Sequence, residues 1–489
     1  MESQGREGVV ESVRFGTDGW RAIIAKEFTF DNVGRVAKAV ADYLRSEDRA
    51  ANPIYTDWGA TFRAADRGVV VGYDTRFLSD AFAEHVCRVL QDEGIPVSLS
   101  DGFIPTPALS YAVADRETAI GIMLTSSHNP APYNGLKLKA AYGGSAPESI
   151  TRAVEERLPS SAPDIVSPAD RIERVDLRTP FLNRVRELID RDLLKDAPIE
   201  VVIDSMYGSA QGYVAELLDE LNIPYIQIRG TRDPLFGGVK PEPLEVNLAP
   251  LREAITQGGT RRRIGAVTDG DGDRISGMDE RGRFIDAHLT YALILRHLVE
   301  TRGWKGPIVV SFNLSDLIRR MAKAYGLETI EIPIGFKHAA EHIVKGNVLM
   351  AGEESGSLAI RGHIPERDGV LCSLLLAEIL ASSDKPASEL IDDLHATFGP
   401  QVYERRDIEL ETRVELVENL KAAPPESFGG LPVRKVETLD GLKLRFDDGW
   451  LLFRASGTEP ILRMYCELPT ADGVRQMLDA AERVARGDN

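Results

Sequence analysis

Short runs of β-branched and aliphatic residues alternate with amphipathic helical patterns through most of the chain. Residues 68–74 are an apolar run typical of a buried strand, and residues 78–94 follow as a helix that ends at a glycine. Residues 96–100 and 118–124 predict two more strands, and the second runs directly into Ser127. This alternation predicts βαβ units on a mainly parallel sheet, a fold that places its sites at the carboxyl ends of strands.

The same order recurs twice further along the chain. A strand at 199–204 precedes a helix from Ser209, and a strand at 306–311 precedes a helix from Ser315. These patterns favour an internal repeat of α/β units. Beyond about residue 400, the apolar stretches 443–446, 450–453 and 461–465 are joined by turn residues such as Asp447-Asp448-Gly449, which predicts antiparallel strands.

The patterns therefore predict three tandem α/β domains with mixed, mainly parallel sheets and a C-terminal α+β domain. Boundaries placed in weakly patterned stretches give domains at 1–158, 159–283, 284–398 and 399–489. The stretch 46–67 has no clear periodicity, and we expect an inserted surface loop there.

Composition narrows the class of protein. A chain of 489 residues is too long for one core, and 43% hydrophobic with 27% charged residues is ordinary for a globular protein. The chain has no apolar run of about 18 residues and starts with polar residues, so we expect neither a transmembrane helix nor a signal peptide. Its three cysteines match no disulfide or zinc spacing, and Cys87 falls in an amphipathic helix. We therefore expect a cytoplasmic protein.

The net charge of −18 argues against nucleic acid and anionic membranes as partners. It also constrains any site for an anionic small molecule. Such a site must collect arginines and lysines locally, against the field of the whole chain.

Two strings carry candidate chemistry. Ser127 stands in Thr-Ser-Ser-His-Asn-Pro (residues 125–130), and Asp269, Asp271 and Asp273 alternate with glycines. A presented hydroxyl can carry a phosphoryl group, and three carboxylates can hold a hard cation such as Mg²⁺ that neutralises phosphoryl oxygens. Glycines remove the Cβ atoms that would hinder a tight loop with converging carboxylates. The two strings predict a metal-assisted phosphoryl transfer site.

An EF-hand is an alternative interpretation of the aspartate run. Counted from Asp269, it would also use Glu280, which is present, but its sixth position requires glycine and here is Arg274. The preceding run 264–267 is of strand type, and glycines interrupt the chain after the loop. A solvated acidic turn is disfavoured because neighbouring carboxylates repel unless a cation lies among them. We expect a metal loop after a buried strand.

Five strings together resemble the α-D-phosphohexomutase family, which includes phosphoglucomutases, phosphomannomutases and phosphoglucosamine mutases. They lie in the order 15–21, 125–130, 269–274, 352–356 and 454–460. The resemblance extends from about Val13 to about Leu468. It implies four domains around a central cleft, with one of the last four strings in each domain.

The resemblance implies roles for these residues. Ser127 matches the phosphoserine, with Ser126 as a second candidate, and Ser127 with Asp269, Asp271 and Asp273 matches the Mg²⁺ ligands. In the sugar-recognition string we expect Glu353 and Ser355, two residues apart in an extended loop, to point the same way toward sugar hydroxyls. The string 454–460 matches a phosphate-binding loop, in which the expected contacts are Arg454, Ser456, Gly457 and Thr458.

Lys137 matches a family lysine that acts as general acid or base once cations or burial lower its pKa. Its alternation with two leucines would also suit a solvent-facing strand residue. Arg367 stands where a lysine is more common, which weakens the case for proton transfer there. Arg21 and Arg274 match arginines that line the reaction centre, and His128 matches a histidine that orients the serine loop. Lys337 and His338 fall where family members carry cations on the substrate side.

The expected activity is that of a mutase that moves a phosphoryl group between the C1 and C6 oxygens of a hexose through phospho-Ser127 and a bound hexose 1,6-bisphosphate. The string Gly-Glu-Glu-Ser-Gly favours glucose, with mannose or dual specificity next and glucosamine after that. A metal-dependent sugar phosphatase and an inactive phosphosugar-binding protein are alternatives from other classes. Partners are expected to be phosphosugars, and the sequence leaves monomer and homodimer open.

Overall fold

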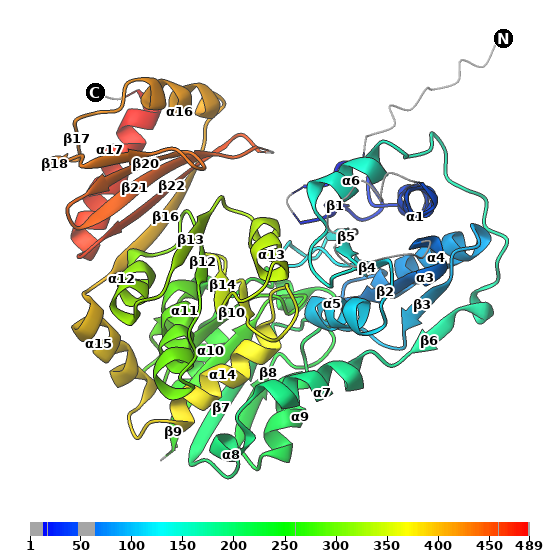
Figure 1. Ribbon diagram of the computed structural model, residues 1–489, viewed down its shortest axis with the longest axis horizontal. Helices are drawn as coiled ribbons and strands as arrows, with labels where there is room; N and C mark the ends of the chain where they lie inside the picture. Colours follow the sequence, from blue (N-terminus) through cyan, green and yellow to red (C-terminus); the bar gives the residue numbers. More distant parts are fainter. Residues whose placement is uncertain (1–12, 17, 47–63, 260, 458, 488–489) are drawn as a thin grey trace.

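The computed structural model of the protein describes residues 13–16, 18–46, 64–259, 261–457 and 459–487. In the described residues, four larger sheets with their helices succeed one another along the chain, and the last unit adds a two-stranded sheet of β17 and β18 (Figure 1). The first unit, drawn blue to cyan, lies at the right and the last, drawn brown to red, at the upper left; the third unit lies below the last, and the second lies at the bottom. Three α/β units and a C-terminal α+β unit confirm the expected fold class.

The first unit is built on the sheet β1-β5-β4-β2-β3-β6, in which β4, β2, β3 and β6 are parallel. Its elements are β1 (Trp20–Ile23), α1 (Phe30–Arg45), α3 (Ala64–Arg67), β2 (Val69–Tyr73), α4 (Ser79–Asp92), β3 (Val97–Ser100), α5 (Thr106–Asp115), β4 (Ile120–Leu124), β5 (Tyr133–Ala140), α6 (Glu148–Glu155), η2 (Ala169–Arg171) and β6 (Glu173–Val175).

The second unit has the sheet β11-β10-β9-β7-β8. Its elements are α7 (Arg178–Leu188), α8 (Arg191–Leu194), β7 (Ile199–Asp204), α9 (Tyr213–Glu220), β8 (Tyr225–Ile228), η3 (Phe236–Gly238), η4 (Glu245–Asn247), α10 (Ala249–Thr256), β9 (Arg262–Thr268), β10 (Ile275–Asp279) and β11 (Phe284–Ile285).

The third unit has the sheet β13-β12-β14-β15. Its elements are α11 (Ala287–Arg296), η5 (His297–Thr301), β12 (Ile308–Ser311), α12 (Asp316–Tyr325), β13 (Thr329–Ile332), α13 (Phe336–Val344), β14 (Met350–Gly352), β15 (Leu358–Ile360), α14 (Gly369–Ala381) and α15 (Ala387–Phe398).

The fourth unit has the antiparallel sheet β16-β22-β21-β20-β19. Its elements are β16 (Val402–Glu409), α16 (Arg413–Ala422), β17 (Ser427–Phe428), β18 (Leu431–Pro432), β19 (Lys435–Glu437), β20 (Leu442–Phe446), β21 (Gly449–Ala455), β22 (Ile461–Leu468) and α17 (Ala471–Arg486).

The first three units share one strand order. In each, three parallel strands are extended by an antiparallel strand, in the orders β5-β4-β2-β3, β10-β9-β7-β8 and β15-β14-β12-β13. The loop before the antiparallel strand carries Ser127 in the first unit, the three aspartates in the second and Glu353 in the third. The shared topology supports the internal repeat, and it puts one candidate string at the same place in each unit.

One hydrophobic core runs through the first three units, because helices pack across unit borders. Helix α14 of the third unit packs on β9 and β7 of the second, and α5 of the first unit packs on α7. Phe181 lies in this core without exposed surface, with its ring centroid 5.9 Å from Tyr213 and 6.0 Å from the imidazole of His363. These contacts make the positions of the first three units depend on one another.

The fourth sheet docks on the third unit through buried charged groups. The ammonium of Lys443 donates to the carbonyl of Phe312 and lies 4.2 Å from the ring centroid of Trp450. The carboxylate of Glu467 accepts the N–H of Asp316 at 2.8 Å, at the start of α12. Backbone groups of the loop between β12 and α12 thereby fix the sheet.

Two expectations differ from the structure or fall outside it. The helix expected from Ser209 begins at Tyr213, because Met206 and Tyr207 adopt positive φ and Gly208 lies against the backbone of the aspartate loop, where a Cβ would come within 2.7 Å of the Gly270 carbonyl. Most of the loop expected at 46–67 lies outside the described residues.

No helix in the described part of the chain is long and apolar enough to span a membrane.

Replacing Phe181 with alanine should lower the free energy of unfolding by about 3–5 kcal/mol, because it leaves a cavity in the shared core. The matched control is Phe77→Ala, since the Phe77 side chain is 56% exposed and its loss should change stability by less than about 0.5 kcal/mol. Urea unfolding followed by fluorescence measures both. Equal effects of the two substitutions would contradict a core shared at Phe181.

Candidate active site

Ser127 lies in a tight loop that follows β4. Its φ is 51°, in the left-handed region that residues with a Cβ rarely adopt, and its N–H donates to Thr125 Oγ1 at 2.9 Å. Its hydroxyl donates to Asp269 Oδ2 at 2.9 Å and lies 3.2 Å from His128 Nδ1. The loop therefore aims the Ser127 hydroxyl at the first aspartate of the predicted metal loop.

Ser126 occupies a different environment. Its side chain is fully buried, and its hydroxyl has no hydrogen-bond partner among the described residues. Of the two serines, Ser127 is the one whose hydroxyl contacts a carboxylate of the metal loop.

Arg76, which the sequence analysis did not single out, holds the serine loop. Its guanidinium donates to the carbonyls of Ser127 at 2.6 Å and Asn129 at 2.7 Å, and at 3.0 Å to those of Pro130 and Tyr133. The side chain is fully buried. A rigid fork with five donors suits this cluster of carbonyls. The sequence signal that could have indicated Arg76 is its position just after the predicted strand 68–74.

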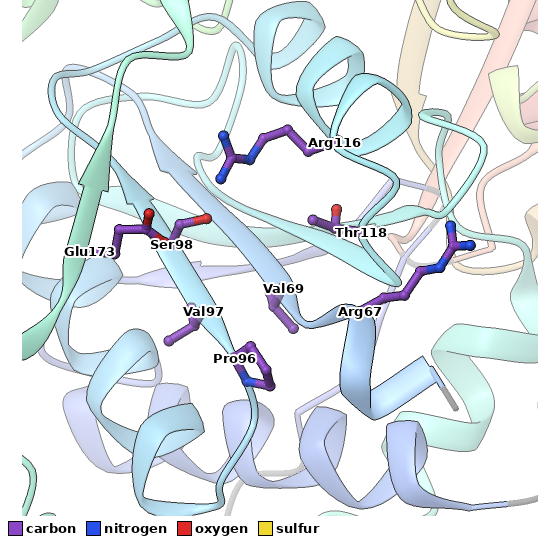
Figure 2. A pocket seen from close by; sticks show the side chains of 8 residues that line it. All are labelled: Arg67, Val69, Pro96, Val97, Ser98, Arg116, Thr118 and Glu173. Carbon is purple, nitrogen blue, oxygen red and sulfur yellow. The ribbon is translucent and has the colours of Figure 1, made fainter. Parts of the chain in front are cut away.

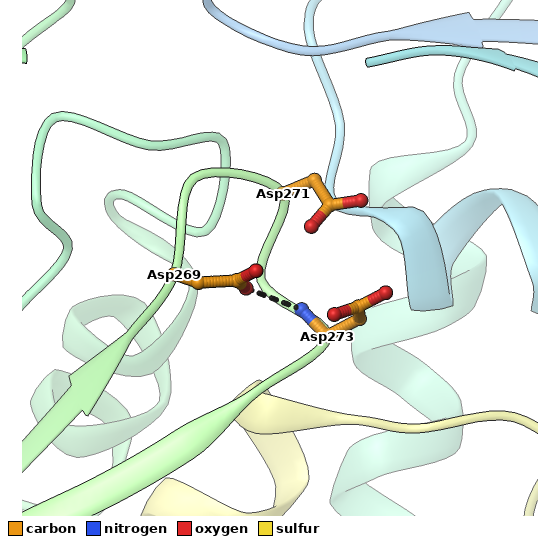
Figure 3. Close-up of side chains that lie close together, drawn as sticks. All are labelled: Asp269, Asp271 and Asp273. Atoms are coloured by element: carbon orange, nitrogen blue, oxygen red, sulfur yellow. Dashed lines mark hydrogen bonds between the residues drawn. The ribbon is translucent and has the colours of Figure 1, made fainter. Parts of the chain in front are cut away.

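The three aspartates converge as expected (Figure 3). Each of Asp269, Asp271 and Asp273 is buried and offers an oxygen within 4.8 Å of the others. Thr106 of the first unit holds this loop from outside, because its hydroxyl donates to Asp271 Oδ2 at 2.6 Å and its N–H donates to the Asp271 carbonyl at 2.8 Å. The first and second units meet at this loop.

The glycines between the aspartates also serve the contact between units. A Cβ on Gly270 would come within 2.5 Å of the Ser127 carbonyl. Gly272 has φ 71°, and a Cβ there would lie 2.8 Å from Pro105 Cβ. Glycine is required at both positions because the first unit packs directly on the loop.

The donor set fits a hard divalent cation. All three ligands are carboxylates, and Oδ1 of Asp271 and Oδ1 of Asp273 are buried without a hydrogen-bond partner in the described part of the chain. Burial and the two neighbouring carboxylates hold the pKa of Asp269 well above its usual range. A cation among the three would relieve this repulsion.

Lys137 is buried, so the interpretation as a solvent-facing strand residue is wrong. Its ammonium lies 2.8 Å from Asp18 Oδ2, 2.8 Å from Asp271 Oδ2 and 2.9 Å from Asp273 Oδ2. Burial alone would lower the pKa of Lys137, but these three carboxylates outweigh it and raise the pKa. Two of the carboxylates that raise this pKa are predicted metal ligands, and the role of Lys137 in proton transfer stays a prediction.

Arg367 and Asp18 complete this charged cluster. Arg367 Nη2 lies 2.6 Å from Asp18 Oδ2 and 2.6 Å from Asp273 Oδ2. Burial would lower the pKa of Arg367, but Asp18, Asp273 and Glu366 raise it well above its ordinary value. Asp18 belongs to the string 15–21, and its contact with Lys137 and Arg367 was not predictable from that string.

The other predicted cations lie beside the serine loop. Arg21 Nη1 donates to Asn129 Oδ1 at 3.0 Å, and Arg274 Nη1 donates to Glu242 Oε1 at 3.1 Å. Burial, together with Arg274 and Arg21, holds the pKa of His128 well below its usual range. A neutral imidazole next to Ser127 suits an orienting role.

The Glu353 loop is a tight turn between β14 and β15, not an extended loop. The N–H of Glu353 donates to the Ser357 carbonyl at 3.0 Å. The Glu353 carboxylate accepts the N–H of Gly335 at 2.7 Å, while the Ser355 and Ser357 hydroxyls lie 2.8 Å apart. The turn gives Glu353 and Ser355 separate contacts, which corrects the expectation that strand alternation aligns them. The carbonyl of Gly356 accepts the N–H of Ile275, directly after the metal loop, at 2.9 Å.

The predicted phosphate loop lies in the fourth unit, beside the third. Arg454 Nε donates to Asp440 Oδ1 at 3.0 Å, and Asp440 Oδ2 accepts the N–H of Ile334 at 2.9 Å. The Ser456 hydroxyl accepts the N–H of Glu459 at 3.3 Å, and open space surrounds the Cβ position of Gly457. Thr458 lies outside the described residues.

Lys337 lies at the start of α13, next to His338, where its ammonium is 3.5 Å from Glu148 of α6. Through Asp440, which contacts Ile334, and Glu353, which contacts Gly335, the fourth unit and the sugar loop meet at one short backbone segment.

A separate cavity of about 410 Å³ lies in the first unit (Figure 2). It is bordered by Arg67 and Arg116 and by residues where β2, β3 and β6 begin. Because Ser127 follows the opposite end of β4, this cavity is not part of the site described above.

Comparison with known proteins gives matches along almost the whole chain. Models of the phosphoglucomutase/phosphomannomutase alpha/beta/alpha domains I, II and III match residues 12–163, 179–282 and 286–398, and that of the C-terminal domain matches 409–484. A phosphoglucomutase/phosphomannomutase of Thermococcus kodakarensis is 30% identical over 467 residues, which cover 95% of this chain and 96% of that protein.

Two further relatives carry other names. A phosphoglucosamine mutase of Limosilactobacillus reuteri subsp. reuteri is 26% identical over 485 residues, covering 97% and 98% of the two chains. A crystal structure from Thermus thermophilus, described as a phosphomannomutase, superimposes with a TM-score of 0.84 at 33% identity and covers 97% of this chain and 99% of that one.

Replacing Asp271 with asparagine should weaken Mg²⁺ affinity by at least about tenfold, because one carboxylate of the set loses its charge. Calorimetric titration of the purified protein with MgCl₂ measures the affinity. The matched control is Glu280→Gln, which an EF-hand would not tolerate. In the structure Glu280 instead accepts the N–H and hydroxyl of Ser388. A large loss of affinity in the Glu280 variant would revive the EF-hand.

Proposed function

Because the chain belongs to the phosphoglucomutase/phosphomannomutase family and is a mutase enzyme, we propose that it interconverts glucose 1-phosphate and glucose 6-phosphate. The proposed route passes through phospho-Ser127 and a bound glucose 1,6-bisphosphate. The observation that carries it is the contact of the Ser127 hydroxyl with Asp269, within a buried three-carboxylate site.

The chemistry is two balanced transfers. In the first, the P–O bond to Ser127 breaks while a P–O bond forms to the free hydroxyl of the hexose phosphate, and the proton of that hydroxyl is passed to the Ser127 oxygen. In the second, the other P–O bond of the bisphosphate to the sugar breaks, the phosphoryl group returns to the Ser127 oxygen, and the Ser127 proton passes to the released sugar oxygen. When bound at Asp269, Asp271 and Asp273, Mg²⁺ would neutralise charge on the phosphoryl oxygens.

The side chains around Ser127 support this reaction electrostatically. Lys137 and Arg367 lie on the carboxylates of the metal loop, and Arg21 and Arg274 flank the serine loop. These cations supply the local positive charge that a chain of net charge −18 needs to bind phosphosugars. Lys137, whose ammonium lies 2.8 Å from Asp271 Oδ2 and 2.9 Å from Asp273 Oδ2, is the proposed general acid or base.

The bisphosphate must bind in two orientations between the transfers. We assign the distal phosphate to Arg454, Ser456, Gly457 and Thr458, with Lys337 on the substrate side, and the sugar hydroxyls to Glu353 and Ser355. This division is supported by the location of the two loops on different units that meet at Ile334 and Gly335. A phosphate loop on its own unit can hold the intermediate while its other end turns.

Glucose is favoured because the sugar string is Gly-Glu-Glu-Ser-Gly. Mannose or dual specificity is the second candidate, and glucosamine the third, since one relative is a phosphoglucosamine mutase. Ratios of kcat/KM on glucose, mannose and glucosamine 1-phosphates decide among them. Release of inorganic phosphate in place of isomerised product would instead favour the sugar phosphatase.

We also propose a cytoplasmic location, which the three buried free cysteines support.

If Ser127 carries the phosphoryl group, purified protein should contain a fraction about 80 Da heavier, and peptide mapping should place the added mass on Ser127. Ser127→Ala should lose both this mass and nearly all mutase activity. Ser126→Ala is the control and should keep both, because Ser126 does not contact the metal loop. Full activity without Ser127, or the added mass on Ser126, would refute the assignment.

Arg454→Ala should lower kcat/KM by roughly ten- to a hundredfold for every hexose phosphate alike, because it removes a charge-assisted contact to a group common to all of them. The control is Arg434→Ala, which should leave kcat/KM unchanged, because the Arg434 guanidinium forms an exposed pair with Asp447.

Glu353→Gln should instead change the ratio of kcat/KM on glucose 1-phosphate to that on mannose 1-phosphate, because the two sugars differ in the orientation of one hydroxyl. A uniform loss in Glu353→Gln would show that this carboxylate does not distinguish sugars.

A further inference from the structure

The segment 363–369 of the third unit lies between the first and second units. The N–H of Gly369 donates to the Gly272 carbonyl in the metal loop at 3.0 Å. On the other side, a Cβ on Gly144 of the first unit would come within 2.6 Å of the Pro365 carbonyl. Two charged residues of this segment, Glu366 and Arg367, are buried in the contact.

Glu366 pairs with Lys139, which the proposed reaction does not use. Lys139 Nζ lies 2.5 Å from Glu366 Oε2, and both side chains are fully buried. Strand alternation in β5 puts Lys139 on the same face as Lys137. The Ser145 hydroxyl adds a hydrogen bond to Glu366 Oε2 at 3.0 Å. Burying two charges costs free energy that their attraction need not recover, so stability alone is a weak reason for such a pair.

The second oxygen of Glu366 connects this pair to the candidate active site. Glu366 Oε1 lies 3.0 Å from Arg367 Nε, while Arg367 Nη2 reaches Asp18 Oδ2 and Asp273 Oδ2. Because Oε1 accepts the backbone N–H of Arg367 at 3.1 Å, its contact with Nε is an ion pair without a hydrogen bond, whereas Nη2 donates to both aspartates. A lysine at 367 would offer only one ammonium to these carboxylates, whereas arginine can serve both edges.

We propose that Lys139 and Glu366 are a positioning pair for Arg367. Their charge balance sets how strongly Arg367 holds Asp273, and with it the Mg²⁺ affinity of the loop, while the fixed carboxylate of Glu366 orients the guanidinium for phosphoryl transfer. The charge of Glu366 draws the guanidinium away from Asp273, and the charge of Lys139 limits that pull. The rate effect rests on the proposed mutase function, whereas the metal effect does not.

The two partners should change Mg²⁺ affinity in opposite directions. In Glu366→Gln, Arg367 loses an anion and holds Asp273 more tightly, so Mg²⁺ affinity should fall by roughly tenfold. In Lys139→Met, Glu366 has lost its lysine partner and attracts the guanidinium of Arg367 more strongly. Arg367 then holds Asp273 less tightly, so the Mg²⁺ affinity should rise severalfold. A pair that only joins the units would lower stability in both variants without this opposition.

Calorimetric titration of the full chain with MgCl₂ gives the affinities, and urea unfolding gives the stabilities. The control is Glu378→Gln, which weakens a buried pair with Arg302 far from the aspartates in sequence and contact. It should destabilise the protein and leave Mg²⁺ affinity unchanged.

The double variant Lys139→Met with Glu366→Gln keeps the net charge and leaves no buried ion unpaired, so it decides the question if the single variants do not fold. Its Mg²⁺ affinity should stay within about twofold of the wild type, because the two charge changes cancel. Its kcat should fall about tenfold with KM unchanged, because Arg367 has lost its charged support.

Mg²⁺ shifts of the same sign in the two single variants, or full kcat in the double variant, would overturn the proposal. If the wild type shows no mutase activity, the proposed function fails, and the order of the Mg²⁺ affinities still tests the pair.

Discussion

The mutual repulsion of three buried carboxylates is the constraint on which the centre of this molecule depends. Asp269, Asp271 and Asp273 cannot share a dry site as anions unless positive charge lies among them. In the structure, Lys137 comes from the first unit and Arg367 from the third to meet a loop of the second. The three units therefore meet where the charge must be balanced, and the backbone contacts at Gly270 and Gly369 follow from that.

The repeated strand order explains how three strings that are distant in the sequence reach one region. A loop that joins a parallel strand to its antiparallel neighbour leaves the sheet at the carboxyl end of the parallel strand, where open α/β sheets present their sites. In the first three units this same loop carries Ser127, the three aspartates and Glu353. Once the core shared by α14, β9 and Phe181 fixes these units, the three loops approach one another.

The fourth unit is attached differently. It touches the third through Lys443, Glu467 and Asp440, and all three hold backbone groups of the third unit. The contact between Asp440 and Ile334 lies next to the N–H that Glu353 accepts. Docking of the fourth unit thus bears on the backbone that Glu353 contacts, which would link the proposed phosphate loop to the proposed sugar loop.

The strands and their alternation with helices were predictable from the sequence, as was the candidate chemistry of the serine and aspartate strings. Apolar runs of strand length form buried strands wherever tertiary contacts cover them, and this holds for β2, β4, β7 and β12. The serine and aspartate strings were recognisable because a phosphoryl carrier and a hard cation each need particular groups at close spacing in the chain.

Only the tertiary structure decided which face of a strand is covered and by what. Alternation in β5 put Lys137 and Lys139 on one face but could not show that this face meets two other units, so Lys137 also suited a solvent-exposed position. Arg76 binds four carbonyls of a loop some fifty positions away, and Arg367 contacts Asp18 across 349 positions. Local sequence patterns extend over a few residues, whereas charge balance in a buried site is settled between units.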